Sequence, residues 1–170
     1  MSDRFPRLAR LLTREGMTDR FVSSYFEAQP PASDSQIDKL RRSVPWIPDD
    51  YVEFLRLTNG CRLEFFVFDG LGDDTPDPIA KNQWQLDDYG RDRWLAIGRD
   101  SGGDVFALGL GGAVGTISFD PPPESPVPLC DDFQTLIEHV CCGNGYADYF
   151  GGDVADSDWH SHIASFGWVE

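Results

Sequence analysis

Residues 94–119, WLAIGRDSGGDVFALGLGGAVGTISF, decide the fold class of this chain. Short apolar runs with the composition of strands lie at 94–97, 105–108 and 114–119. Only the glycine-rich segments 98–104 and 109–112 connect them. A parallel crossover needs a dozen or more residues, so strands joined this tightly must be antiparallel neighbours. The stretch therefore predicts the centre of a mainly antiparallel sheet.

Two helices are predicted between residues 33 and 60. Ser33 and Gln36 have the spacing of a capping box, which begins the first helix. Pro48 suits the first position of the second helix, and Asn59-Gly60 has the composition of its C-terminal cap. Apolar residues repeat at helical spacing in both segments, so each helix should bury one face.

One more strand and a late helix flank the central sheet. The aromatic run 63–68 predicts a single strand that ends at Asp69-Gly70. Prolines at 121–123 and at 126 are expected to end the sheet. Asp131 or Asp132 then begins a helix whose apolar side holds Phe133, Leu136, Ile137 and Val140. Helices, an antiparallel meander and a helix, in this order, make an α+β fold.

The first 30 residues predict an accessory helical hairpin that packs on a domain formed by residues 31–170. One short helix is expected before Gly16, and Thr18 can cap a second helix that continues to Pro30-Pro31. The tail from Gly151 is rich in glycine and aspartate. It ends in apolar residues that we expect to pack back on the domain: Ile163, Phe166 and Trp168.

The length and the charge of the chain limit its function. Its 170 residues make one domain, large enough to build a core without metals or disulfides. Acids outnumber bases 29 to 14, and the net charge of −15 disfavours contact with nucleic-acid phosphates or anionic lipid. The four cysteines do not have the pattern of a disulfide framework, and we find no signal peptide or membrane-spanning run. These features predict a cytoplasmic protein that binds neither nucleic acid nor membrane.

The charge is unevenly distributed along the chain. Residues 1–42 contain eight bases and six acids, whereas residues 43–170 contain six bases and 23 acids. No lysine or arginine follows Arg99, although twelve acids do. Solubility or an acidic proteome in the source lineage would explain this charge, and so would a basic partner drawn in by electrostatic steering. The sequence alone leaves both explanations open.

The glycine-rich segment 98–104 does not match a catalytic or phosphate-binding motif. It lacks the terminal Lys-Ser or Lys-Thr of a phosphate loop, and a strand follows where that loop needs a helix. Ser101 lacks the flanking pattern of a nucleophile elbow, and the aspartates do not follow the EF-hand spacing. A β-turn with glycines at positive φ is the better interpretation.

Four side chains that could bind a metal occur late in the chain: His139, Cys142, His160 and His162. They could form a tetrahedral zinc site, but the paired spacing of zinc modules is missing, and buried or capping roles are favoured. No cysteine–histidine pair and no pair of carboxylates is set apart as a catalytic unit. We therefore predict no metal, no cofactor and no enzymatic activity. A metal-dependent enzyme that uses His and Cys residues is the last alternative.

The stretch 37–108 resembles the SUKH superfamily, which contains a fungal cell-wall regulator, the Syd protein and many bacterial immunity proteins. The resemblance rests on WIPDDY at 46–51, Asn59-Gly60, WLAIG at 94–98 and GGDVFAL at 102–108. It implies a SUKH-like α+β domain that binds other proteins without catalysis. Many bacterial members resemble antidotes that cap a toxin, often a nuclease. The negative charge independently suits such a basic partner.

The leading hypothesis is an immunity-type protein that neutralises a basic, nuclease-like toxin through an acidic sheet edge and loop. Trp84 is the predicted buried anchor of this contact. The predicted acidic contacts are Asp69, Asp73, Asp74, Asp77, Asp87, Asp88, Asp100 and Asp104. The alternative is a regulatory or scaffold module, as in the fungal relative, whose partner need not be basic. The sequence leaves the oligomeric state open.

Overall fold

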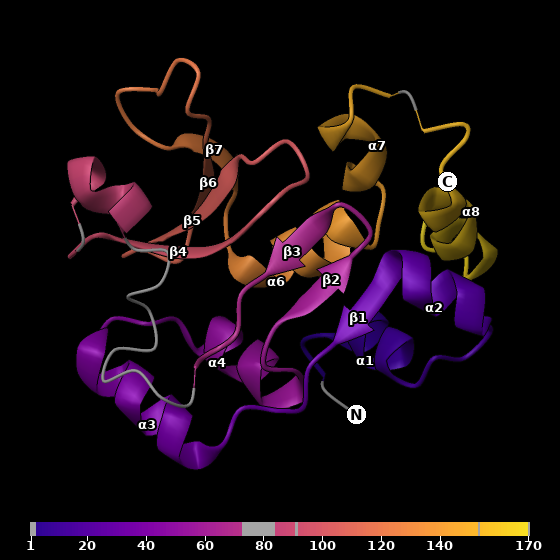
Figure 1. Ribbon diagram of the computed structural model, residues 1–170, viewed down its shortest axis with the longest axis horizontal. Coiled ribbons are helices and arrows are strands. Elements are labelled where there is room, and N and C mark those ends of the chain that lie inside the picture. The colour runs from indigo at the N-terminus through magenta and orange to yellow at the C-terminus, as the bar shows by residue number, and fades with distance from the viewer. Residues whose placement is uncertain (1–2, 73–83, 91, 153, 170) are drawn as a thin grey trace.

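The computed structural model describes residues 3–72, 84–90, 92–152 and 154–169 (Figure 1). Its strands are β1 (Phe26–Ala28), β2 (Cys61–Leu63), β3 (Phe66–Phe68), β4 (Trp94–Arg99), β5 (Val105–Gly109), β6 (Val114–Ile117) and β7 (Val127–Cys130). Its helices are α1 (Pro6–Leu12), α2 (Asp19–Tyr25), α3 (Asp34–Ser43), α4 (Asp49–Leu57), the 3₁₀ helix η1 (Trp84–Tyr89), α6 (Phe133–Thr135), the π-helical η2 (Leu136–Cys141), α7 (Gly145–Tyr149) and α8 (Asp158–Ser165).

The described residues form one seven-stranded sheet, in which every strand lies beside its neighbours in sequence. Every neighbouring pair is antiparallel, from β1–β2 to β6–β7. The short connections between β4, β5 and β6 force this arrangement, because a parallel crossover would need a longer chain. The α+β class and the antiparallel sheet predicted from the sequence are confirmed.

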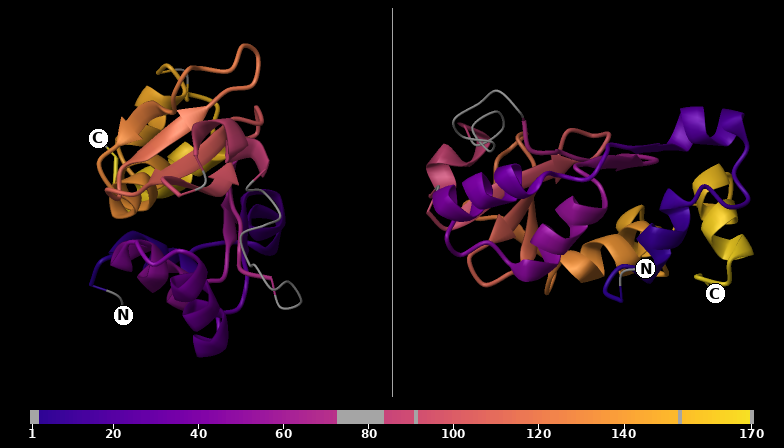
Figure 2. Two further views of the ribbon diagram at one scale, coloured as in Figure 1. Left: turned by 90° about the vertical axis from the view of Figure 1, so that its left-hand side faces the viewer. Right: turned by 90° about the horizontal axis from the view of Figure 1, so that it is seen from below.

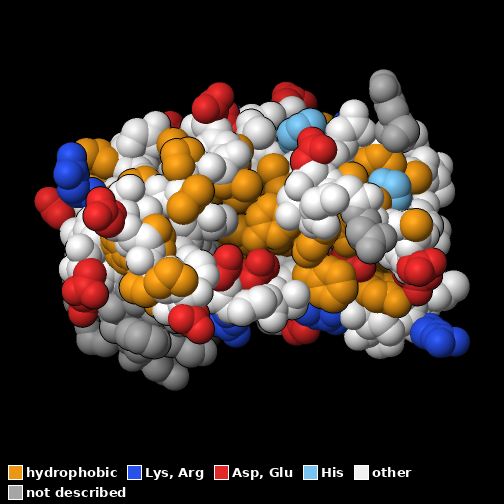
Figure 3. Space-filling view, turned by 90° about the horizontal axis from the view of Figure 1, so that it is seen from above, with side chains coloured by type: hydrophobic (Ala, Val, Ile, Leu, Met, Phe, Trp, Pro, Cys, Tyr) orange, Lys and Arg blue, Asp and Glu red, His pale blue; other side chains and the backbone are white. Residues whose placement is uncertain are grey.

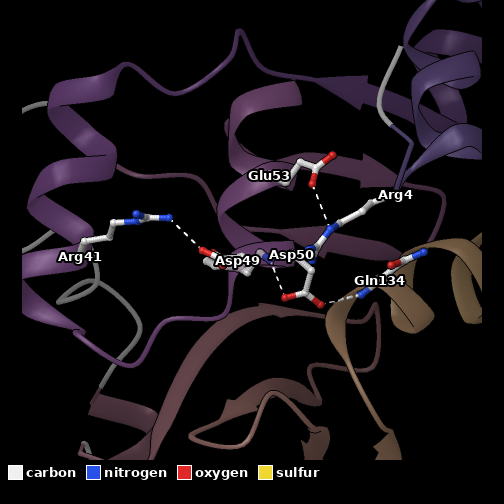
Figure 4. Close-up of polar contacts among 7 residues, drawn as sticks. Arg4, Arg41, Asp49, Asp50, Glu53 and Gln134 are labelled. Atoms are coloured by element: carbon white, nitrogen blue, oxygen red, sulfur yellow. Dashed lines mark hydrogen bonds and ion pairs between the residues drawn. The ribbon is translucent and has the colours of Figure 1, made fainter.

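One face of the sheet carries the main hydrophobic core, which the helices cover (Figure 2). Phe54 of α4, Phe68 of β3 and Phe133 of α6 pack edge to face within it, with ring centroids 4.9–5.9 Å apart. The buried carboxylate of Asp50 joins α4 to α6, since it accepts from the backbone N–H of Gln134 at 3.1 Å (Figure 4). The second face of the sheet is partly covered by η1, whose Leu86 packs against β4, β5 and β6.

The N-terminal segment contributes to both the core and the sheet. Phe5, Leu8 and Leu11 are buried in the main core, and α1 lies beside η2 (Figure 2). After α2 the chain continues as edge strand β1, which pairs with β2. The helix predicted to reach Pro30 therefore ends at Tyr25, where the backbone becomes extended and Phe26 enters the core.

Two other predictions about strands were wrong. The segment 63–68 is not one strand, because Glu64 adopts a left-handed φ of 55° and the chain turns into the β2–β3 hairpin. The prolines do not end the sheet, since β7 follows them and pairs with β6. Pro128 is tolerated in β7 because an edge strand can dispense with a donor on its outer side.

Signals for the N-terminal ends of helices were more reliable than strand lengths. The predicted ends of α4 were wrong, because Pro48 is its N-cap and the extended Thr58, not Asn59-Gly60, is its C-cap. The capping box of Ser33 and Gln36 is present in both directions, and Asp132 caps the late helix by accepting from the Thr135 N–H. The tail, expected only to pack back, contains α8, which Ser157 caps. Gly98 is required where β4 pairs with β3, because a Cβ there would lie 2.2 Å from the Val67 carbonyl oxygen.

Candidate protein-binding surface

Three connections leave the sheet at the same end, which we call the turn end. They are the β2–β3 turn (64–65), the β4–β5 turn (100–104) and the β6–β7 loop (118–126). They share this end because each pair of neighbouring strands is antiparallel. Two of the predicted acidic contacts, Asp100 and Asp104, lie here.

Asp100 determines the shape of the β4–β5 turn. Its Oδ1 accepts from the backbone N–H of Asp104 at 3.0 Å, and its own N–H donates to the Asp104 carbonyl at 2.9 Å. Its Oδ2 accepts from the Tyr149 hydroxyl of α7 at 2.9 Å. Burial and this hydrogen bond raise the pKa of Tyr149, so the phenol stays protonated as the donor. Asp100 is therefore a positioning residue of the turn, with both oxygens used inside the chain.

Glu64 anchors the β2–β3 turn from the inside. Its backbone N–H donates to the Tyr25 carbonyl at 2.6 Å. Its buried carboxylate accepts from the Tyr146 hydroxyl and, at 3.1 Å, from the Ser157 hydroxyl. Burial raises the pKa of Glu64, although both hydrogen bonds act in the opposite direction. The inward side chain of Glu64 leaves the next residue, Phe65, to project outward.

Three of the four large hydrophobic side chains that the described residues expose lie at the turn end. They are Phe65, Phe119 and Val127, which are exposed by 43%, 45% and 52%. The exposed carboxylates of Asp120 and Glu124 lie in the same loop as Phe119. This loop is held to η1, because the Tyr89 hydroxyl donates to the Pro123 carbonyl at 2.8 Å. The turn end thus combines fixed backbone with exposed apolar and acidic side chains.

Figure 3 shows the molecule from above, relative to the view of Figure 1. The β6–β7 loop and α7, which lie at the top of Figure 1, are therefore on the side that faces the viewer. Hydrophobic side chains gather in the middle of this face, and acidic side chains lie among and around them. Lysine and arginine side chains are seen only near its margins. An apolar centre with a polar rim is the usual anatomy of a protein interface, and here the rim is acidic.

The other predicted contacts lie elsewhere or outside the described residues. Asp87 and Asp88 are exposed on η1, over the second face of the sheet. Asp69 follows β3 on the side of α4, where burial and then the charge of Asp69 raise the pKa of Tyr51. Outside the described residues lie Asp73, Asp74 and Asp77, together with the side chain of Trp84. The structure therefore brings Asp100 and Asp104 together and places Asp69, Asp87 and Asp88 apart from them.

We compared the chain with models of known protein families to find the family to which it belongs. The model of the SMI1 / KNR4 family (SUKH-1) matches residues 31–139, well over half of the chain. The chain belongs to this family. The SUKH resemblance found in the sequence is thereby confirmed. No curated protein matches this SUKH-1 chain.

SUKH-1 membership narrows the kind of function. Domains of this family are binding domains of the immunity or regulatory kind and are generally non-enzymatic. They are linked to protein partners, and toxins are among these partners. Helices α1, α2, α7 and α8 lie outside the matched residues, so this SUKH-1 protein adds helices at both ends of the family domain.

The ion pairs of this SUKH-1 domain do not involve its turn end. Those found between described residues are Arg4–Glu53 at 3.3 Å, Arg10–Glu15 at 3.4 Å and Arg41–Asp49 at 2.9 Å, the first and last of which Figure 4 shows. None of them includes an acid beyond residue 53. The carboxylates of the turn end therefore have no cationic partner within the described part of the chain.

The His and Cys residues weighed as zinc ligands make other contacts. Within the described ranges, no group of three or more His, Cys, Asp or Glu side chains could hold a metal ion. His162 packs on the ring of Phe21, with centroids 4.4 Å apart. Burial raises the pKa of Cys142 well above its usual value, which disfavours the thiolate that a metal needs. No helix among the described residues combines the length and hydrophobicity that spanning a bilayer demands.

Sequence reasoning missed the apolar part of the turn end. Phe65 and Phe119 fell inside the predicted strands 63–68 and 114–119, where they would be buried in a sheet. A signal was present for the loop, because Asp120 and Glu124 enclose three prolines, which is typical of an exposed connection. No local signal marks Phe65, since its exposure depends on the left-handed turn at the preceding residue.

Replacing Glu64 by glutamine is expected to change how stability depends on pH. The folded-state pKa of Glu64 is raised by burial, so the group stabilises the fold below its unfolded pKa. This contribution is lost as the pH rises through the folded pKa. Relative to wild type, Glu64→Gln should therefore gain stability from about pH 4 to about pH 7, as measured by urea unfolding.

The exposed carboxylate of Glu124 provides the matched control for this experiment. Glu124→Gln changes the same chemical group at the same end of the sheet, but at an exposed position, so it separates the loss of a buried carboxylate from the loss of a charge. Burial also raises the pKa of Glu138, but that group is present in all three proteins and cancels from the comparison. Parallel pH profiles for wild type and Glu64→Gln would contradict the assignment.

Proposed function

We propose that this SUKH-1 protein is a non-catalytic, cytoplasmic immunity protein that neutralises a basic, nuclease-like toxin by binding it through the turn end. One observation carries the proposal: exposed hydrophobic side chains share this end with carboxylates that form no ion pair with any described residue. The chain supplies no lysine or arginine after Arg99 that could neutralise them. A surface that is both apolar and strongly negative suits a partner with a positive active-site cleft.

The proposed neutralisation works by occupying the site that would otherwise hold nucleic acid. A nuclease binds phosphate groups through lysine and arginine side chains. Asp104, Asp120 and Glu124 offer carboxylates to the same side chains. These rim charges accelerate encounter, and the exposed hydrophobic side chains of the turn end slow dissociation once they are buried. The predicted acids between residues 69 and 88 extend the negative field, and Trp84 remains a proposed anchor.

Co-expression with a toxin domain encoded next to the gene tests this function. The protein should restore growth of cells that express the toxin. The Kd of the purified pair should rise at least tenfold between about 50 and 500 mM salt, because salt screens the attraction. A Kd that does not change with salt would contradict the electrostatic contact. Binding without restored growth would favour the regulatory alternative.

A further inference from the structure

Helices α2 and α8 border an open pocket that is separate from the turn end and is lined mostly by exposed residues. Its volume is about 450 Å³, which lies within the range of small-molecule sites. All of its lining residues belong to segments 18–25 and 158–165. Neither segment is part of the SUKH-1 match, so the family does not account for this pocket.

The two walls of the pocket are held together by specific contacts. The Tyr25 hydroxyl of α2 donates to Asp158 Oδ2 of α8 at 2.7 Å. The ring of Phe21 stacks on Trp159 at a centroid distance of 6.1 Å and also contacts His162. Trp159 is fully buried, and its Nε1–H donates to the Cys141 carbonyl at 2.9 Å. The pocket is therefore built on packed elements of the fold.

Opposite charges lie on the two walls. Arg20 belongs to α2 and Asp158 belongs to α8. The hydrogen bond to Asp158 raises the pKa of Tyr25, whereas the charge of Arg20 lowers it. Both charges are thus close enough to act on the same phenol. Arg20 forms no ion pair with any described residue, so its guanidinium is available.

Further polar groups in the pocket have no partner among the described residues. The side-chain hydroxyls of Ser24 and Ser161 line the pocket and make no hydrogen bond with the described chain. The Nε2 atom of His162 is buried and also lacks a partner there. Ser24 and Ser161 are exposed, so only the buried His162 Nε2 carries the cost of an unpaired polar atom, which a ligand or water at the site would relieve.

We propose that this pocket binds a small zwitterion, either a free α-amino acid or a dipeptide. The ligand carboxylate would meet the guanidinium of Arg20 and the serine hydroxyls, and its ammonium group would meet the carboxylate of Asp158. A ligand with a single charge would leave one wall unpaired. This inference is independent of the toxin-binding proposal, because the pocket and the turn end share no residue.

Titration of the ¹⁵N-labelled full chain, followed by NMR, tests the pocket. The probes are the twenty standard amino acids and a set of dipeptides, each at about 5 mM. At least one probe should give saturable shifts confined to segments 18–25 and 158–165, with a Kd below about 1 mM. The class of probe that binds with the lower Kd, amino acids or dipeptides, identifies the source of the zwitterion. The absence of such shifts for every probe would overturn the proposal.

Two derivatives and two variants test the charge requirement. The N-acetyl and the amide derivatives of the best probe each lack one charge and should bind at least tenfold more weakly. Arg20→Gln and Asp158→Asn should weaken the best probe to the same extent. The matched controls Arg42→Gln and Asp156→Asn change exposed residues outside the pocket and should bind as wild type does. Equal binding by either derivative or either pocket variant would overturn the zwitterion assignment.

Discussion

Protection against the toxin is expected to disappear when Asp104, Asp120 and Glu124 are all replaced by lysine. Each substitution converts an attractive charge pair into a repulsive one at the rim of the turn end. Close charge pairs across interfaces couple by about 1.5 kcal/mol or more, so three reversals should raise the Kd at least about 1000-fold. Any one substitution alone should raise the Kd about tenfold, partly through a slower association rate.

The matched control for this experiment is a triple reversal on η1 and just after it, which we call the η1 reversal. Asp87, Asp88 and Asp92 are exposed, and their replacement by lysine likewise removes three negative charges and adds three positive ones, which takes the net charge from −15 to −9. This control should slow association by less than about tenfold and leave growth protection intact. If instead the η1 reversal abolished protection and the turn-end reversal did not, the contact would lie over the second face of the sheet. Growth assays and surface plasmon resonance distinguish these outcomes.

Deletion of residues 1–30 is expected to leave residues 31–170 without a cooperatively folded state. The deletion removes edge strand β1 and several fully buried side chains of the core, namely Phe5, Leu8, Leu11 and Phe26. Loss of one such side chain typically costs about 2–5 kcal/mol, whereas an entire domain has only about 5–15 kcal/mol of stability. Far-ultraviolet circular dichroism and urea unfolding measure this loss.

A pair of leucines on α1 refines the same test. Leu8 is fully buried and Leu12 is only partly buried, although both pack against the main core. Leu8→Ala should lower the free energy of unfolding by about 2–5 kcal/mol, and Leu12→Ala should lower it by clearly less. A truncated chain that kept the wild-type unfolding midpoint would show that the first 30 residues are dispensable to the domain.

The parts of the fold that were predicted correctly depend on neighbouring residues. A capping box needs only Ser33 and Gln36, and the antiparallel order of β4, β5 and β6 needs only short connections. The missed parts depend on distant partners. Residues 127–130 form strand β7 because they pair with β6. Helix α2 ends where it does because Phe26, the next residue, is buried in the core.

The candidate site likewise has features that the sequence predicts and features that depend on the tertiary structure. The acidic character of Asp100 and Asp104 follows from the sequence, but the use of Asp100 to hold Tyr149 depends on where α7 packs. The exposure of Phe65 and Phe119 was not predictable, because hydrophobic residues in a strand-like run are normally buried. Only the tertiary structure shows that these rings stay partly exposed, although Phe65 packs edge to face on Phe150 at a centroid distance of 5.6 Å.

The order of the residues by itself determined the α+β class, the family, the N-terminal caps of α2, α3 and α6, and the excess of negative charge. Each of these depends on composition or on spacings of a few residues, which hold whatever surrounds them. The tertiary structure decided which aspartates share a surface, which aromatic rings stay exposed, and how α2 and α8 meet around a pocket. The pocket arises from contacts between segments that are more than a hundred residues apart, as with Tyr25 and Asp158, and no local pattern encodes such contacts.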